Sequence, residues 1–205
     1  MSRRSPYKRP DRFTQAAKKQ GYPARSVFKL EEMDRRLKLL RQGMRVLDLG
    51  SAPGSWTMYV AQKIGPGGRL LSVDLKPLDV PLPPHVVAVA GDALSLDEPV
   101  LAQFAPYDVV LSDMAPNTTG NRLGDQTRSF ELFMRALAVG STLLKVGGSF
   151  VGKIFMGEDF PAARAAVKAA FAEDRVIRPE GTRATSYEAF IVGLGRREGA
   201  GDAEP

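Results

Sequence analysis

The segment at residues 46–56, VLDLGSAPGSW, constrains the fold of this chain more than any other stretch of its sequence. It opens with strand-forming and apolar residues, ends that run at Gly50, and places a second glycine, Gly54, in the following turn. A short apolar run that ends at a glycine is typical of a strand buried on both faces. The segment therefore predicts a buried strand followed by a tight turn.

Asp48 is a carboxylate inside this apolar run. Burying a carboxylate costs free energy unless the group is paired or hydrogen-bonded. We therefore expect Asp48 to accept hydrogen bonds from the backbone N–H groups of the turn at residues 50–54 and to hold that turn in place.

The turn also distinguishes between kinds of cofactor. A dinucleotide-binding turn has the pattern G-x-G-x-x-G, in which backbone N–H groups and the following helix bind a pyrophosphate. Here the glycines are Gly50 and Gly54, and Pro53 has no N–H to offer a phosphate. A cofactor without phosphate fits better, which favours S-adenosylmethionine. Taken alone, the turn is also compatible with an ordinary strand-to-helix connection.

Composition limits the class of protein. The 205 residues suit one domain. The chain has neither an apolar run long enough to cross a membrane nor an apolar signal-peptide core, so we expect a cytoplasmic protein without a membrane partner. The chain lacks cysteine, and its single histidine, His85, lies in the proline-rich stretch PLPPHVV. Thiolate zinc sites, Ser-His-Asp triads and H-E-x-x-H sites are therefore excluded, and we expect no metal.

Positive charge is concentrated at the N-terminus. Residues 1–29 contain nine Lys or Arg and one acid, whereas the remaining chain has 20 basic and 22 acidic residues. Tyr7, Phe13 and Tyr22 are interspersed among the cations, a composition typical of segments that bind RNA phosphates and stack on bases. A solvated tail and a mitochondrial transit peptide are the alternatives, and the many lysines weaken the second.

This composition suggests three parts of the chain. We expect a flexible basic arm over residues 1–21, one domain over 22–195, and a disordered tail over 196–205. We expect the protein to be a monomer.

Hydrophobic periodicity predicts that strands and helices alternate along the domain. The expected helices are 26–40, with Ser26 as its cap, 55–64, 97–104, 126–145 and 159–172. The expected strands are 45–49, 69–73, 86–90, 107–112, 149–155, 174–177 and 187–194. This order predicts an α/β, Rossmann-like fold, with a mostly parallel, doubly wound sheet and an antiparallel C-terminal hairpin at its edge.

Polar residues stand where the parallel strands end. In open α/β sheets, ligands bind beyond the carboxyl ends of the strands, so Gly50, Asp74, Asp92, Asp113 and Lys153 should meet at one rim. Asp74 could accept the ribose hydroxyls of an adenosine, although it could instead cap a helix. Asp92 could accept the adenine amino group, although it could be a simple turn residue.

The segment SDMAPN, after the fourth strand, indicates the methyl acceptor. Enzymes that methylate an exocyclic base nitrogen commonly have Asn or Asp, then Pro-Pro and an aromatic residue, whereas this chain has Asn117 at the aromatic position. A base amine is therefore a poor candidate. A hydroxyl acceptor needs help to lose its proton, which basic residues beside acids could provide.

Four motifs, in order, carry a resemblance to a known family. VLDLGSAPGSW, SDMAPNTTG, SFVGKIFMG and SYEAFIVGLG, preceded by ARSVFKL, resemble the FtsJ (RrmJ) family of ribosomal RNA 2′-O-ribose methyltransferases. The resemblance covers residues 22–195. It departs at Ser55, where the family usually has a second glycine, and a serine is tolerable there if its φ is negative.

The resemblance implies a site and a reaction. The catalytic tetrad would be Lys29, Asp113, Lys153 and Glu188. The cofactor, S-adenosyl-L-methionine, would be bound by Gly54, Trp56, Asp74, Asp92 and Asp113, together with Gly50 of the turn. The implied reaction is 2′-O-ribose methylation of large-subunit (23S-type) ribosomal RNA, at a uridine in the peptidyl transferase region.

Lys153 is the general base that the resemblance implies, and a base must be neutral, whereas an ordinary lysine is almost fully charged at pH 7. Burial and Lys29 favour its neutral form, while Asp113 and Glu188 favour the charged form, in which Lys153 would position the hydroxyl. The sequence leaves both roles open, along with a purely structural salt-bridge network.

Other functions remain open as well. They are 2′-O-methylation of tRNA or of a messenger cap, a non-catalytic RNA-binding role in ribosome assembly, and a nicotinamide-dependent oxidoreductase, which the missing third glycine disfavours.

Overall fold

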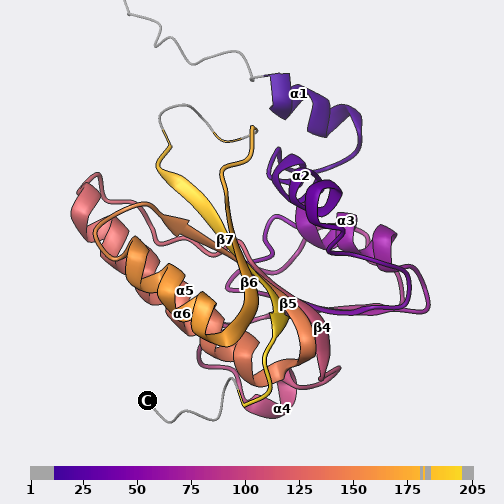
Figure 1. The fold of residues 1–205 in the computed structure, drawn as a ribbon. Helices are drawn as coiled ribbons and strands as arrows, with labels where there is room; N and C mark the ends of the chain where they lie inside the picture. The colour runs from indigo at the N-terminus through magenta and orange to yellow at the C-terminus, as the bar shows by residue number, and fades with distance from the viewer. Residues whose placement is uncertain (1–11, 181, 183–185, 200–205) are drawn as a thin grey trace, which may run out of the picture.

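The computed structural model describes residues 12–180, 182 and 186–199, and one mixed sheet forms its centre (Figure 1). The strands are β1 (Arg45–Leu49), β2 (Arg69–Asp74), β3 (Val86–Ala90), β4 (Tyr107–Ser112), β5 (Leu144–Phe155), β6 (Phe171–Ile177) and β7 (Glu188–Arg196). The helices are α1 (Arg12–Lys19), α2 (Val27–Leu37), α3 (Ser55–Ile64), α4 (Glu98–Leu101), α5 (Arg122–Leu143) and α6 (Phe160–Ala170). In this described part of the chain, no helix is both long and apolar enough to cross a membrane.

The strand order is β3-β2-β1-β4-β5-β7-β6. The pairs among β1 to β5 are parallel, whereas β7 pairs antiparallel with β5 on one side and with β6 on the other. The mostly parallel, doubly wound sheet and its antiparallel C-terminal hairpin are thus confirmed. β7 lies inside the sheet and β6 forms its edge, so residues of β7 face those of β5 directly.

Two hydrophobic cores cover the two faces of the sheet. Helices α2 and α3 pack over one face, and α5 and α6 pack over the other (Figure 1). Alternation along β1 sends Val46 into the first core and Leu47 into the second, as expected for a strand buried on both faces. Both faces of the sheet are therefore packed, which fixes the groups at the carboxyl ends of its parallel strands.

Helix α1 occupies part of the segment over residues 1–21 that was expected to be a flexible arm. Ala17 is buried, and the ring of Phe13 lies 5.8 Å from that of Phe28 on α2. An eight-residue helix is marginal by itself, so this contact with α2 stabilises it, and local sequence could not reveal such a contact. Residues 1–11 lie outside the described part of the chain.

Several element boundaries differ from the sequence predictions. Helix α2 stops before residue 40 because Lys38 adopts the left-handed conformation, with φ of 54°. Ser26 occupies the N-cap position of α2, but its side chain makes no capping hydrogen bond. Helix α5 begins at Arg122, earlier than expected, because the Asn121 side chain accepts a hydrogen bond from the N–H of Gly124.

The C-terminal elements are also shifted. Strand β6 begins at Phe171, inside the predicted helix, because this aromatic ring packs in the core beside Phe150. Strand β5 starts five residues earlier than expected, and β7 extends to Arg196, the first residue of the predicted tail. Residues 200–205 of that tail lie outside the described residues.

Asp48 is fully buried in β1, and it does not hold the turn. Its Oδ2 accepts a hydrogen bond from the hydroxyl of Thr57 on α3, at 2.9 Å, whereas its Oδ1 has no hydrogen-bond partner among the described residues. The expectation from the sequence was wrong because strand alternation directs the side chain under α3, away from the turn. Burial, with the nearby charges of Asp113 and Asp74, raises the pKa of Asp48 to about 7.

We predict that Asp48→Asn flattens the pH dependence of stability. Since the folded-state pKa of Asp48 is raised from 3.8 to about 7, the native protein binds a proton that the unfolded chain lacks between these values. Wild-type stability should therefore fall as pH rises through that window and remain reduced above it. Asparagine has the same shape and cannot ionise, so the variant should be more stable than wild type at pH 8, with a gap that narrows toward pH 4. Urea unfolding across this range measures both curves; parallel curves would contradict the assignment.

Candidate active site

The backbone N–H groups of the turn after β1 are hydrogen-bonded within the protein. They all donate to protein oxygens: Gly50 and Ser51 to the Val73 carbonyl at 2.8 and 3.2 Å, Ala52 to Asp74 Oδ2 at 2.9 Å, and Gly54 to the Ser51 carbonyl at 2.7 Å. Pro53 has no N–H to add. The turn thus offers no donor from residues 50–54 to a phosphate, and Asp74, rather than Asp48, holds it.

Both glycines of the turn are required by the backbone. Gly50 and Gly54 have φ of 79° and 104°, a region that favours glycine. A Cβ on Gly50 would lie 2.7 Å from the Met114 side chain, and one on Gly54 would lie 2.8 Å from Val80. The turn is therefore packed closely against residues that follow β4 and β2.

Ser55 departs from the pattern of the resembling family and has a structural role. Its Oγ accepts from the N–H of Ala24 at 2.8 Å and donates to the carbonyl of Ala24 at 3.1 Å. Ser55 thereby joins the first residue of α3 to the segment that leads into α2, which carries Lys29.

A cavity of about 350 Å³ lies beside this turn, at the carboxyl ends of β1, β2, β3 and β4. The carboxylates of Asp74, Asp92 and Asp113 line it, with Lys76 as the opposing cation among its lining residues. Apolar side chains such as Leu75 and Met114 complete its walls. A cavity with surplus negative charge fits a ligand that carries positive charge and no phosphate.

Asp74 and Asp92 each combine a structural contact with a place in this cavity. The Oδ1 of Asp74 accepts from the N–H of Lys76, and the Oδ1 of Asp92 accepts from the N–H of Leu94, both at 2.9 Å. These are turn contacts, as the alternative for Asp92 expected, whereas the alternative for Asp74, a helix cap, is wrong because β3 is the next element after β2. A carboxylate has about four acceptor sites, so both residues retain acceptors for a ligand.

Gly54 and Trp56 lie outside the lining of the cavity. The Trp56 side chain is 2 % exposed, and its Nε1–H donates to the carbonyl of Ser26 at 2.9 Å. Its ring therefore belongs to the core between α3 and α2. The structure brings Gly50, Asp74, Asp92 and Asp113 together around the cavity, but not these two.

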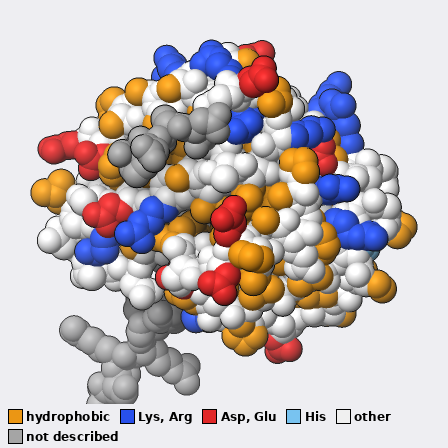
Figure 2. Space-filling view, turned by 90° about the horizontal axis from the view of Figure 1, so that it is seen from below, with side chains coloured by type: hydrophobic (Ala, Val, Ile, Leu, Met, Phe, Trp, Pro, Cys, Tyr) orange, Lys and Arg blue, Asp and Glu red, His pale blue; other side chains and the backbone are white. Residues whose placement is uncertain are grey.

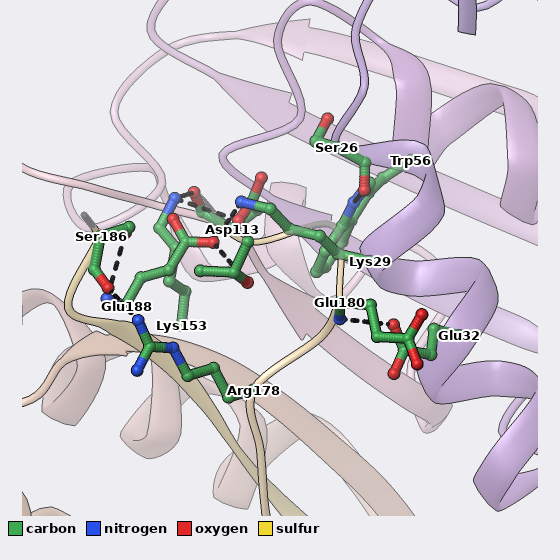
Figure 3. A network of polar contacts seen from close by, with 11 residues as sticks. Ser26, Lys29, Glu32, Trp56, Asp113, Lys153, Arg178, Glu180, Ser186 and Glu188 are labelled. Carbon is green, nitrogen blue, oxygen red and sulfur yellow. Dashed lines mark hydrogen bonds and ion pairs between the residues drawn. The ribbon is translucent and has the colours of Figure 1, made fainter. Parts of the chain in front are cut away.

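The structure gathers the four predicted tetrad residues in one network of polar contacts, in which Asp113 also lines the cavity (Figure 3). Lys153 Nζ lies 3.0 Å from Asp113 Oδ1 and also donates to the Asp113 carbonyl, while Lys29 pairs with Glu188. These side chains are between 9 % and 17 % exposed, so they are shielded from bulk water yet reachable by a substrate. Asp113 belongs to both the cavity and the tetrad.

Strand pairing explains why these groups meet. Lys153 on β5 is directly opposite Phe190 on β7, and Glu188 is two residues from Phe190, so Lys153 and Glu188 project from the same face. Lys29 comes from the first turn of α2, and Asp113 follows β4, the parallel neighbour of β5. The site therefore requires the antiparallel strand as well as the parallel part of the sheet.

The connection between β6 and β7 is fastened to α2, which the sequence did not predict. Glu32 Oε2 accepts from the N–H of Glu180 at 2.8 Å, and Arg178 donates to the carbonyl of Ser186 (Figure 3). Ser186 Oγ accepts from the N–H of Glu188 at 3.2 Å. Glu32 stands three residues after Lys29, so helical spacing could have placed both on one face.

Residues 22–196 match the family model described as FtsJ-like methyltransferase. The chain belongs to the FtsJ-like methyltransferase family. It is 66 % identical to the ribosomal RNA large subunit methyltransferase E of Sorangium cellulosum, over 95 % of this chain and 92 % of that protein. It is 49 % identical to the protein of the same name from Desulfatibacillum aliphaticivorans, over 93 % and 92 % of the two chains.

Solved structures share the fold at lower identity. A ribosomal RNA methyltransferase from Plasmodium falciparum has a TM-score of 0.74 at 22 % identity, covering 85 % of this chain and 98 % of its own. Aeropyrum pernix fibrillarin, solved with S-adenosyl-L-methionine, has a TM-score of 0.56 at 16 % identity, covering 76 % and 68 %.

Family membership confirms the methyltransferase fold and S-adenosyl-L-methionine as the methyl donor. The cavity fits this donor, because its carboxylates suit a sulfonium and an ammonium group, and the turn offers no phosphate site. Among the described residues, no group of His, Asp and Glu is placed to hold a metal ion.

We predict that Asp92→Asn weakens S-adenosyl-L-methionine binding roughly tenfold, the value of one hydrogen bond. Asparagine keeps an oxygen for the N–H of Leu94 but presents a donor, in place of an acceptor, to the adenine amino group. Asp97→Asn is the matched control, since Asp97 lies outside the cavity lining and makes no side-chain capping hydrogen bond. Titration calorimetry measures both affinities, and equal affinities for the two variants would remove Asp92 from the cofactor site.

Proposed function

We propose that this protein transfers a methyl group from S-adenosyl-L-methionine to a ribose 2′-hydroxyl of large-subunit ribosomal RNA. The observation that carries the proposal is the pair of ion pairs, Lys153 with Asp113 and Lys29 with Glu188, at the end of a carboxylate-lined cavity. The names of the relatives support the RNA substrate. We propose a uridine in the peptidyl transferase region as the acceptor, in the cytoplasm.

The bound cofactor would supply an electrophilic methyl group on its sulfonium. Gly50, Asp74 and Asp92 would hold the cofactor, because they line the cavity and retain space or free acceptors. The acceptor oxygen must approach the methyl group to roughly 3–3.5 Å, so positioning contributes much of the rate. Asp113 belongs to the tetrad and also lines the cavity, so it would fix the distance between the methyl group and the acceptor oxygen.

The tetrad would remove the proton of the ribose 2′-hydroxyl and stabilise the negative charge that develops on its oxygen. Lys153 Nζ would take the 2′-hydroxyl proton once it has given up its own, and its two contacts with Asp113 hold this nitrogen in place. Lys29, held by Glu188, places a positive charge where negative charge develops on the ribose oxygen. The cavity and the tetrad are complete within one chain, which supports a monomer as the active unit.

We predict that Lys153→Ala lowers the rate of methyl transfer by about 10²- to 10⁴-fold, the usual contribution of a general base. Cofactor affinity should stay near wild type, because Lys153 does not line the cofactor cavity. Lys145→Ala is the control from the same strand, since Lys145 is an exposed residue paired with Asp108. Incorporation of tritiated methyl into large-subunit RNA, assembled large subunits and tRNA measures rate and substrate preference together.

Lys153→Arg separates the two possible roles of the lysine. Arginine keeps the positive charge but cannot lose its proton. A base role therefore requires this variant to be as inactive as Lys153→Ala, whereas substantial residual activity would assign Lys153 to charge stabilisation. Near-normal methylation by Lys153→Ala would contradict the proposed site altogether.

We predict that deleting residues 1–11 weakens RNA binding and flattens its salt dependence. The segment holds four Arg or Lys and one Asp, and contacts between cations and phosphates release counterions. The deletion leaves α1 in place, so the melting temperature should not change. Filter binding across a salt series tests this, and an unchanged slope would show that the segment contacts no phosphate.

A further inference from the structure

A second cavity, of about 450 Å³, lies between the C-terminal part of α2 and helix α3, away from the cofactor site. Four cations line it: Arg35, Lys38, Arg41 and Lys63. The acids in its lining are Glu31 and Asp34, and Leu40 and Tyr59 complete the wall. We refer to it as the α2–α3 cavity.

Asp34 is largely occupied by structural contacts. Its Oδ1 accepts from the N–H of Leu40 and its Oδ2 from the hydroxyl of Tyr59, both at 2.9 Å, and Lys63 Nζ lies 3.5 Å from Oδ2. Burial and the hydrogen bond with Asp34 raise the pKa of Tyr59 above its ordinary value, so its hydroxyl adds no negative charge. The cations of the cavity therefore outweigh its acids.

Three of the cations are free for a ligand. Within the described part of the chain, Arg35, Lys38 and Arg41 form no ion pair, whereas Lys63, the fourth cation of the cavity, is paired with Asp34. All three residues are exposed to solvent. In Figure 2, Lys and Arg side chains lie on the right, the side on which Figure 1 draws α2 and α3, and others lie at the upper and left edges.

Lys38 occupies a backbone position that glycine usually fills. Its φ of 54° is in the left-handed region, and the other residues with positive φ in the described chain are glycines. A side chain is strained there, so glycine would end α2 more easily. Lys38 therefore keeps a cation in the lining of the cavity although its backbone is strained.

We propose that the α2–α3 cavity binds a backbone phosphate of the RNA substrate, several nucleotides from the methylated ribose. The inference rests on the proposed function, since α2 carries both Lys29 of the tetrad and the cations of this cavity. Nine residues, about 2.5 turns and 14 Å of helix, separate Lys29 from Lys38, so the cavity lies well away from the ribose at the tetrad. Unpaired cations without neighbouring base-reading groups position a strand rather than read its sequence.

The test compares two matched double variants, Lys38→Gln with Arg41→Gln, and Arg135→Gln with Lys168→Gln. The control residues are an exposed arginine and lysine on α5 and α6, on the other face of the sheet. Binding of large-subunit RNA is measured across a salt series, with methyl transfer by wild type in parallel. We expect the first pair to weaken binding about tenfold or more and to reduce the salt slope by about 0.7, for one single-strand phosphate contact, and the control to retain wild-type values.

Equal affinities and slopes for the two double variants would overturn the inference. Failure of the wild type to methylate this RNA would overturn the proposed function instead, so the two failures are distinguishable. A third variant, Lys38→Gly, removes the cation and also relieves the backbone strain, so a loss of RNA binding in it is not explained by misfolding. Weaker RNA binding with an unchanged or higher melting temperature supports the phosphate site, and unchanged binding overturns it.

Discussion

The contact between Lys153 and Asp113 joins the two halves of this site. Asp113 follows β4, and its backbone N–H donates to the Leu49 carbonyl of β1 at 3.1 Å, so its position is set by the sheet. Its side chain lies at the boundary between the cofactor cavity and the tetrad, where it meets Lys153 from the neighbouring strand at 3.0 Å. Asp113 thereby connects the cofactor cavity to the tetrad.

The antiparallel strand β7 brings an acidic residue of the tetrad beside the parallel part of the sheet. A purely parallel sheet places its side chains at the rim one strand at a time, whereas β7 runs back beside β5 and presents Glu188 next to Lys153. Glu188 in turn holds Lys29 of α2, and Glu32 on the same helix binds the backbone of Glu180. The tetrad thus depends on contacts that join α2, Glu180 and the sheet.

The sequence was sufficient to predict the fold and the groups that meet at the rim, because strand periodicity and motif order determine both. It failed where a side chain had two possible partners. Asp48 was expected to hold the turn, but it bonds Thr57, and Asp74 takes that role. Helix α1 and the burial of Trp56 depend on contacts with α2, which no local pattern encodes. The excess of cations in the α2–α3 cavity likewise appears only when residues of α2 and α3 are placed together.

Charge is divided between two surfaces that suit the two substrates. Carboxylates line the cofactor cavity, and unpaired cations line the α2–α3 cavity on the face that carries Lys29. The most direct test of the account is the chemical position of the transferred methyl group. Large-subunit RNA labelled by the enzyme with tritiated S-adenosyl-L-methionine is hydrolysed in alkali, which cannot cleave beside a 2′-O-methyl ribose. We predict that the label appears in alkali-resistant dinucleotides; label in mononucleotides would show base methylation and contradict methylation of the ribose.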